Sequence, residues 1–156
     1  KFHAVVSDEN IMAYALWWLN SESDIRRQFD EFFSVPRFPH YGVYLCDGDT
    51  FLGMGVLLED FKSGGGEIGY FLLSEFWGKG YGLETAQILC EICFNELGLH
   101  KALATCNADN SASEKIMKKL GMQREGILRQ ARRKDGAWHD EYFYGILREE
   151  WLAQKD

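Results

Sequence analysis

Three glycines at alternate positions, Gly78, Gly80 and Gly82, stand between a strand-like run and a long helical pattern. Glycine adopts positive φ readily and lets backbone amides come close to a ligand. The start of the following helix adds unpaired N–H groups and a partial positive charge. These features predict a site for an anionic group such as a phosphate or pyrophosphate, to which Lys79 could add a cation. A tight structural turn is the competing interpretation.

Two well-known phosphate-binding loops do not fit this segment. A Walker loop needs Ser or Thr after the lysine, and Lys79 is followed by Gly80. A dinucleotide fingerprint needs a third glycine where this chain has Leu83. The interpretation of this loop as a phosphate site therefore depends on the elements around it.

The hydrophobic pattern predicts a mixture of strands and helices around the loop. Strands are expected at Lys1–Val6, Tyr41–Cys46, Phe51–Glu59, Glu67–Leu73, Lys101–Cys106, Met122–Arg132 and Trp138–Leu147. Helices are expected at Ile11–Leu19, Ser23–Phe33, Gly82–Leu97, Ser111–Leu120 and Arg148–Lys155. This order predicts an α+β (mixed α/β) fold, with residues 1–156 forming a single domain.

Short polar segments indicate how these elements are joined. Asp47-Gly48-Asp49 and Asp135-Gly136 are typical of tight β-hairpins. Ser111 and Glu114 have the spacing of a capping box, which predicts a helix start at Ser111.

Composition excludes several classes of protein. The chain has 46% hydrophobic residues and a net charge of −7, so it is globular and is not a general nucleic-acid binder. No apolar run is long enough to span a bilayer, and the first ten residues do not resemble a signal peptide. Cys90 and Cys93 form a CxxC inside a helical pattern, which favours two buried thiols over a redox or zinc site. Reduced cysteines and a cytoplasmic location are expected.

Several ordered segments together resemble the GNAT acyltransferases, in particular the RimJ/RimL-type ribosomal-protein N-terminal acetyltransferases. They are IGYFLLSEFWGKGYGLETA from Ile68, NADNSASEKIMKKLGM from Asn107, and EGILR with DGAWHDEYFYGILREEW ending at Trp151. The resemblance covers residues 42–151. It implies a central, mostly antiparallel sheet of about six to seven strands, flanked by helices and splayed between strands 4 and 5.

The resemblance also implies a site for acetyl-CoA as cosubstrate, with no metal. The glycine-rich loop binds the pyrophosphate, and pantetheine lies between the strands at Glu67–Leu73 and Lys101–Cys106. Trp77 departs from the Gln or Arg that usually begins the family's loop, which matters little if backbone amides bind the phosphates. The expected cofactor-binding residues are Phe71, Leu72, Leu73, Trp77, Gly78, Lys79, Gly80, Tyr81, Gly82, Asn107, Asn110 and Ser113.

Acetyl transfer to an amine needs a base for the ammonium and an acid for the departing thiolate. By the family pattern, Ser113 is the expected acid. Glu67 is the expected base because it lies on the central strand near the acceptor side, and a solvated charge at the start of the strand is the alternative interpretation. Asp140 and Glu141, next to His139, are rivals for the base. Tyr70 and Tyr81 are rivals for the acid, although packing or stacking is their commoner role.

Asn110 and a basic cluster each allow more than one interpretation. Asn110 could contact the cofactor, cap a helix, or do both. Basic residues around the last hairpin form either a solvated rim or a contact with RNA or the 3′-phosphate of CoA. They are Arg124, Arg129, Arg132, Arg133 and Lys134.

The sequence therefore predicts an acetyl-CoA-dependent N-acetyltransferase in which an amine attacks directly within a ternary complex. A protein N-terminal α-amine is the expected acceptor. A polyamine, an antibiotic or an amino acid is the alternative acceptor, and an inactive acyl-CoA sensor or scaffold is the alternative function. No DNA or membrane partner is expected, and the chain is expected to be a monomer or homodimer.

Overall fold

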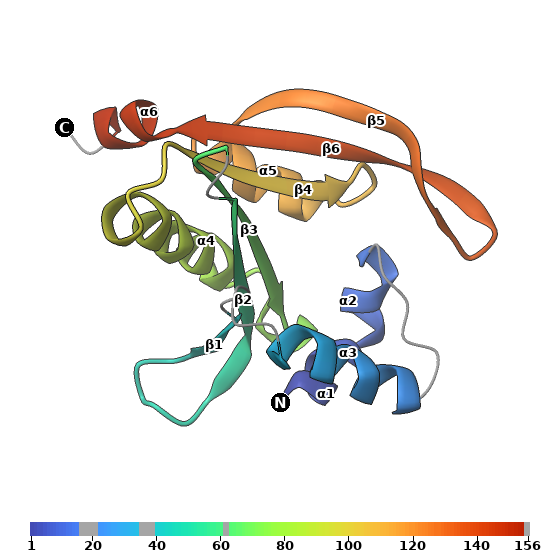
Figure 1. Cartoon of the computed structure of the whole chain (residues 1–156). Helices are drawn as coiled ribbons and strands as arrows, with labels where there is room; N and C mark the ends of the chain where they lie inside the picture. The colour runs from blue at the N-terminus through green and yellow to red at the C-terminus, as the bar shows by residue number, and fades with distance from the viewer. Residues whose placement is uncertain (16–21, 35–39, 61–62, 155–156) are drawn as a thin grey trace.

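The computed structural model describes residues 1–15, 22–34, 40–60 and 63–154, which form one six-stranded sheet with helices packed around it (Figure 1). The strands are β1 (His40–Tyr44), β2 (Phe51–Asp60), β3 (Gly65–Leu72), β4 (Lys101–Asn107), β5 (Gln123–Lys134) and β6 (Ala137–Leu147). The helical elements are α1 (Phe2–Val6), α2 (Glu9–Tyr14), α3 (Glu22–Ser34), η1 (Ser74–Phe76), α4 (Tyr81–Glu91), η2 (Ile92–Glu96), α5 (Ser111–Lys119) and α6 (Arg148–Ala153).

The sheet divides into two halves between β3 and β4. The strand order is β1-β2-β3-β4-β6-β5, and β3 and β4 are the parallel neighbours in an otherwise antiparallel sheet. Their pairing runs from Gly65–Lys101 to Glu67–Leu103 and stops there, although β3 continues to Leu72 and β4 to Asn107. Figure 1 shows the two strands diverging. The predicted mixed α/β fold and the predicted splay are both confirmed.

Each face of the sheet carries its own apolar cluster. Side chains alternate along a strand, so Ile68 and Phe71 of β3 point to opposite faces. Ile68 belongs to the large core that includes Leu89 of α4 and Met117 of α5. Phe71 packs against a smaller cluster with Ile11 of α2. The helices α4 and α5 therefore cover one face, and the N-terminal helices lie against the other.

The two predicted hairpins are present. Asp47 accepts hydrogen bonds from the backbone of Asp49 and Thr50, and Gly48 between them has φ 90°. At the other hairpin, Asp135 and Gly136 have φ 49° and 81°, which suits a two-residue turn between twisted strands.

Two local expectations were wrong, and one helix that was predicted correctly differs in its last turn. Lys1–Val6 was expected as a strand but residues 2–6 form α1, in which the consecutive residues Val5 and Val6 are both buried. The helix expected to Leu97 changes at Ile92 into a π-helical turn. The cap of α5 is Asn110, whose Oδ1 accepts from the Ser113 amide at 3.0 Å, so Ser111 does not begin a capping box.

Candidate active site

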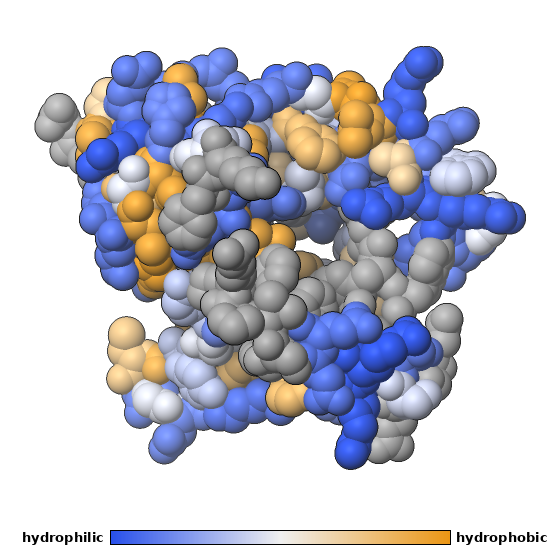
Figure 2. Space-filling view, in the orientation of Figure 1, coloured by the Kyte–Doolittle hydropathy of each residue, from blue (hydrophilic) through white to orange (hydrophobic). Residues whose placement is uncertain are grey.

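A cavity of about 770 Å³ fills the opening between β3 and β4. Its walls come from β3, β4, the glycine-rich loop, α5, α2 and the β5–β6 hairpin. In the space-filling view, the molecule is hollowed between the half that carries β5 and β6 and the half that carries the N-terminal helices (Figure 2). The place where sheet pairing ends is therefore also the place where a ligand can enter.

The glycine-rich loop joins β3 to α4 and faces the cavity. Gly78 and Gly80 have φ 74° and 93°, and Gly80 is the N-cap of α4. Gly82 serves packing instead, since a Cβ there would lie 2.9 Å from Ile116 Cδ1 of α5. Trp77 fastens the loop, because its Nε1 donates to the Leu72 carbonyl at 2.7 Å. The loop thus presents a helix start at the cavity mouth, as an anion site requires.

The structure brings most of the expected cofactor-binding residues to the cavity. Those that line it are Phe71, Leu72, Trp77, Gly78, Gly80, Gly82, Asn107, Asn110 and Ser113. Three others lie outside its lining. Leu73 packs in the N-terminal cluster, Tyr81 makes an edge contact with the Phe76 ring, and Lys79 lies over that same ring.

Two lysines at the cavity were missed by sequence reasoning. Lys115 and Lys119 of α5 line it, and their spacing of four residues puts them on one helix face. That spacing was the available signal. With Arg132 they give the described lining three cationic side chains against one anionic side chain, Glu141.

Ser113 and Tyr70 form a hydroxyl pair across the cavity. Their oxygens lie 3.0 Å apart, and the Tyr70 hydroxyl also lies 3.3 Å from the Ser113 carbonyl, to which it can donate. Burial raises the pKa of Tyr70 well above its usual range, against the opposing effect of the Ser113 hydrogen bond. The phenol therefore stays protonated and can supply a proton to Ser113. Asn110 caps α5, which confirms one of its expected roles, and it also lines the cavity, so its contact with the cofactor stays a prediction.

Glu67 reaches the cavity through a neighbour. It lies at the last position at which β3 pairs with β4, outside the cavity lining. Its Oε1 accepts from Thr105 Oγ1 at 3.0 Å. Thr105 does line the cavity and was not singled out from the sequence. Its alternation with buried Ala104 and Cys106 on β4 was the only signal for it.

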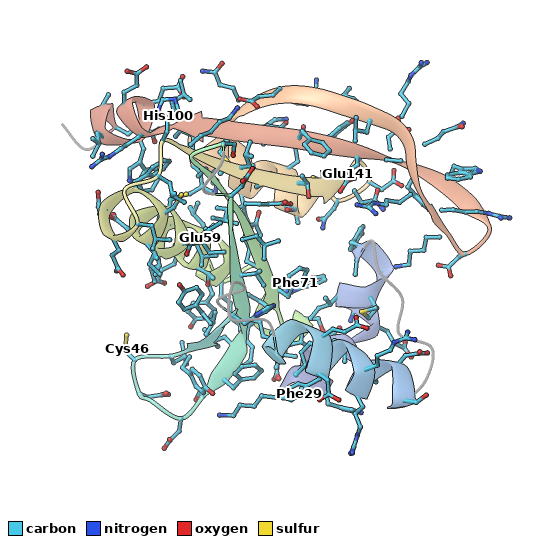
Figure 3. All side chains as sticks on the ribbon, in the orientation of Figure 1. Phe29, Cys46, Glu59, Phe71, His100 and Glu141 are labelled. Carbon is cyan, nitrogen blue, oxygen red and sulfur yellow. The ribbon has the colours of Figure 1, made fainter. Side chains whose placement is uncertain are left out.

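The three rivals for the base on β6 have separate surroundings. Glu141 lines the cavity, is 4% exposed, and lies 3.5 Å from Arg132 Nε (Figure 3). Asp140 accepts from the Gln130 amide at 2.8 Å, where β5 is bulged. His139 pairs with Asp109 at 3.1 Å. Of these three residues, only Glu141 lines the cavity.

The basic residues of the hairpin also have distinct contacts. Lys134 is buried and donates to the Met12 carbonyl and, at 3.1 Å, to the Ala15 carbonyl at the end of α2. Arg124 lies 4.9 Å from the centre of the Tyr142 ring. Arg129 and Arg133 are exposed. The cluster is therefore not a uniform solvated rim.

The cysteines and the aromatic residues of the N-terminal helices fit ordinary packing where they are described. Cys90 and Cys93 are fully buried, as expected, and form no disulfide in the described part of the chain. Phe29 packs edge-to-face on Phe2 and is 43% exposed, while Trp17 and Trp18 lie outside the described residues. In the described part of the chain, no helix is both long and apolar enough to cross a bilayer.

Comparison with known proteins assigns the family. A model described as an acetyltransferase (GNAT) domain matches residues 1–123. YnaD of Bacillus subtilis, named an uncharacterized N-acetyltransferase, is 37% identical over 147 residues, covering 93% of this chain and 85% of that protein. YdaF of the same strain, whose name gives ribosomal N-acetylation as its conjectured activity, is 32% identical over 89 residues, or 57% of this chain and 49% of that protein.

Solved structures of acetyltransferases have the same fold as this chain. A GNAT-family acetyltransferase from Bacillus anthracis has a TM-score of 0.81 at 32% identity, covering 95% of this chain and 87% of that one. Spermidine N-acetyltransferase from Vibrio cholerae, solved with CoA and spermine, has a TM-score of 0.85 at 20% identity, covering 96% and 89%. The chain therefore belongs to the GNAT acetyltransferase family and is an acetyl-CoA-dependent N-acetyltransferase. The expected family is confirmed, and the RimJ/RimL branch stays a prediction.

Proposed function

We propose that this enzyme acetylates the α-amino group at the N-terminus of a protein or peptide. The charge of the cavity supports this acceptor. Glu141 is the one carboxylate among the described lining residues, and Arg132 lies beside it. With Lys115 and Lys119 the described lining has a net positive charge, which disfavours a polyamine with several ammonium groups more than a peptide with one. The name of YdaF agrees with this acceptor, and the likeness to the spermidine enzyme extends to the fold alone.

In the proposed reaction, the amine attacks the thioester carbonyl carbon of acetyl-CoA. The ammonium first gives a proton to Glu67, directly or through Thr105. The tetrahedral intermediate then expels the CoA thiolate, which takes a proton from Ser113, and Tyr70 replaces that proton through their 3.0 Å contact. The attacking nitrogen loses its second proton to solvent as the amide forms, and Tyr70 regains a proton from solvent. The products are the acetylated amine and CoA thiol, and the proton on Glu67 also returns to solvent.

The surroundings of Cys106 favour direct attack over an acetyl-enzyme. This thiol lines the cavity, but burial, helped by the negative charges of Glu114 and Glu141, raises its pKa to about 11. Because the thiolate is the nucleophilic form, Cys106 is a poor acceptor of the acetyl group near neutral pH.

An acceptor panel tests the proposed function. We expect release of CoA thiol with peptides that have a free N-terminus, and none with the same peptides blocked by formylation. Mass spectrometry should place the added acetyl group on the α-amine. Turnover of spermidine or an amino sugar, with peptides left unmodified, would contradict the proposal.

A further inference from the structure

Glu141 has an unusual position for a carboxylate. Its side chain is 5% exposed, and its described ion-pair partner Arg132, with 56% of its side chain exposed, lies 3.5 Å away. A buried carboxylate with one long ion-pair contact is costly unless another donor satisfies it. Because Glu141 lines the cavity, a bound ligand can be that donor.

The sheet register places Glu141 at a fixed position relative to the proposed base. Asn107 is opposite Glu141 and Thr105 is opposite Phe143, so Thr105 and Glu141 are diagonal neighbours on one face of the sheet. Such neighbours are about 7–8 Å apart. Since Thr105 donates to Glu67, the backbone of Glu141 lies about that far from the backbone of the residue that links the proposed base to the cavity.

A carboxylate beside a guanidinium offers an acceptor next to a donor. A peptide unit has the complementary pair, an N–H and a C=O. An extended peptide advances about 3.4 Å per residue, so the second peptide unit lies about 7 Å beyond the α-amine. This spacing matches the separation between Thr105 and Glu141.

We propose that Glu141 and Arg132 form an acceptor subsite for the second peptide unit of an extended N-terminal segment. Glu141 accepts its N–H and Arg132 donates to its C=O, while the α-amine lies beside Thr105. The α2 side chains Ile11 and Tyr14, which also line the cavity, form the facing wall. This subsite rests on the proposed function, because it requires a peptide acceptor.

Two short acceptors test the subsite. Alanine N-methylamide has one peptide unit, and Ala-Ala N-methylamide has two. We expect kcat/KM to be about tenfold or more higher for the longer acceptor, the effect of a hydrogen bond to a charged group. In Glu141→Ala and Arg132→Met the ratio of kcat/KM between the longer and the shorter acceptor should fall to about one. Glu141→Gln, which keeps an acceptor oxygen, should retain part of it.

Arg133→Met is the matched control, since Arg133 is an exposed neighbour outside the cavity lining. It should keep the wild-type ratio, and all variants should keep the acetyl-CoA affinity measured by calorimetry. Equal turnover of the two acceptors by the wild type would overturn the subsite, as would an equal loss on both in Glu141→Ala. Failure of every peptide acceptor in the wild type, with another amine turned over, would overturn the proposed function as well.

Discussion

The hydroxyl pair of Ser113 and Tyr70 gives the candidate site its clearest proton donor. Ser113 is held by its place in the first turn of α5, and Tyr70 by β3, so the two come from opposite sides of the opening. The raised pKa of Tyr70 means that its proton is present throughout the range in which an amine can be a nucleophile. In the proposed mechanism the two residues therefore act as one donor.

Replacing either hydroxyl should slow turnover. We expect Ser113→Ala and Tyr70→Phe each to lower kcat about 10²-fold or more, with acetyl-CoA affinity nearly unchanged, since general acid catalysis contributes about 10²–10⁴-fold. The double variant should be little worse than the worse single variant, because both changes break the same relay. Steady-state kinetics with calorimetry measures this. Additive losses would show that the two hydroxyls act separately.

Among the elements, the start of α4 is the predicted site for the phosphates of acetyl-CoA. Gly80→Val should cost about 1–2 kcal/mol of stability, because its φ of 93° is strained for a residue with a Cβ. It should also weaken acetyl-CoA binding, because the loop amides can no longer close on the pyrophosphate.

Gly98→Val is the control for backbone strain. Gly98 has φ 64° and, like Gly80, has open space where a Cβ would lie, yet it follows η2 and is outside the cavity lining. Its stability loss should match that of Gly80→Val while its acetyl-CoA affinity stays at the wild-type value by calorimetry. Unchanged affinity in a folded Gly80→Val variant would refute the loop assignment.

A second element-scale prediction concerns Asp8, the N-cap of α2. Its carboxylate accepts from the amides of Asn10 and Ile11, and from the Ser74 amide of η1 at 2.8 Å, so it ties α2 to the segment before the glycine-rich loop. Asp8→Ala should cost about 1 kcal/mol in the free energy of unfolding, the usual effect of losing a helix cap.

The pH dependence of this effect follows from the pKa of Asp8. Burial raises that pKa, but the hydrogen bonds from Ser74, Ile11 and Asn10 outweigh it and hold the pKa below 3.8. A lowered folded pKa means that the stabilisation is present above pH 3.8 and is lost as pH falls through the folded value. Urea titrations of both proteins should therefore converge in acid. A constant difference down to low pH would contradict this account.

Local signals account for what the sequence could predict. The glycines at 78, 80 and 82 and the Asp-Gly turns act on their own backbone, so their elements were predicted correctly. Val5 and Val6 became helical because tertiary packing buries both, which a weak alternation cannot reveal. Leu73 packs in the N-terminal cluster and Tyr81 packs on the Phe76 ring, and neither lines the cavity. The spacing of residues around a loop does not determine which of their side chains enter a cavity.

On the scale of the whole molecule, the two sides of the cavity are joined at the tip of the β5–β6 hairpin. Lys134 binds carbonyls of α2 that are more than a hundred positions away in the sequence. The same residue is part of the basic cluster for which the sequence alone favours a solvated rim, with RNA or the 3′-phosphate of CoA as the alternative contact. The contact explains how α2, which supplies Ile11, Tyr14 and Ala15, stays in place as a wall.

Lys134→Met should loosen that wall. Its loss leaves the Met12 and Ala15 carbonyls without their buried donor, at a cost of about 1–3 kcal/mol. Because α2 lies on the acceptor side, we expect KM for the peptide acceptor to rise while calorimetry shows unchanged acetyl-CoA affinity. Arg133→Met, its exposed neighbour, should change neither the melting temperature nor KM. An equal loss of affinity for acetyl-CoA in Lys134→Met would instead place α2 in the cofactor half of the cavity.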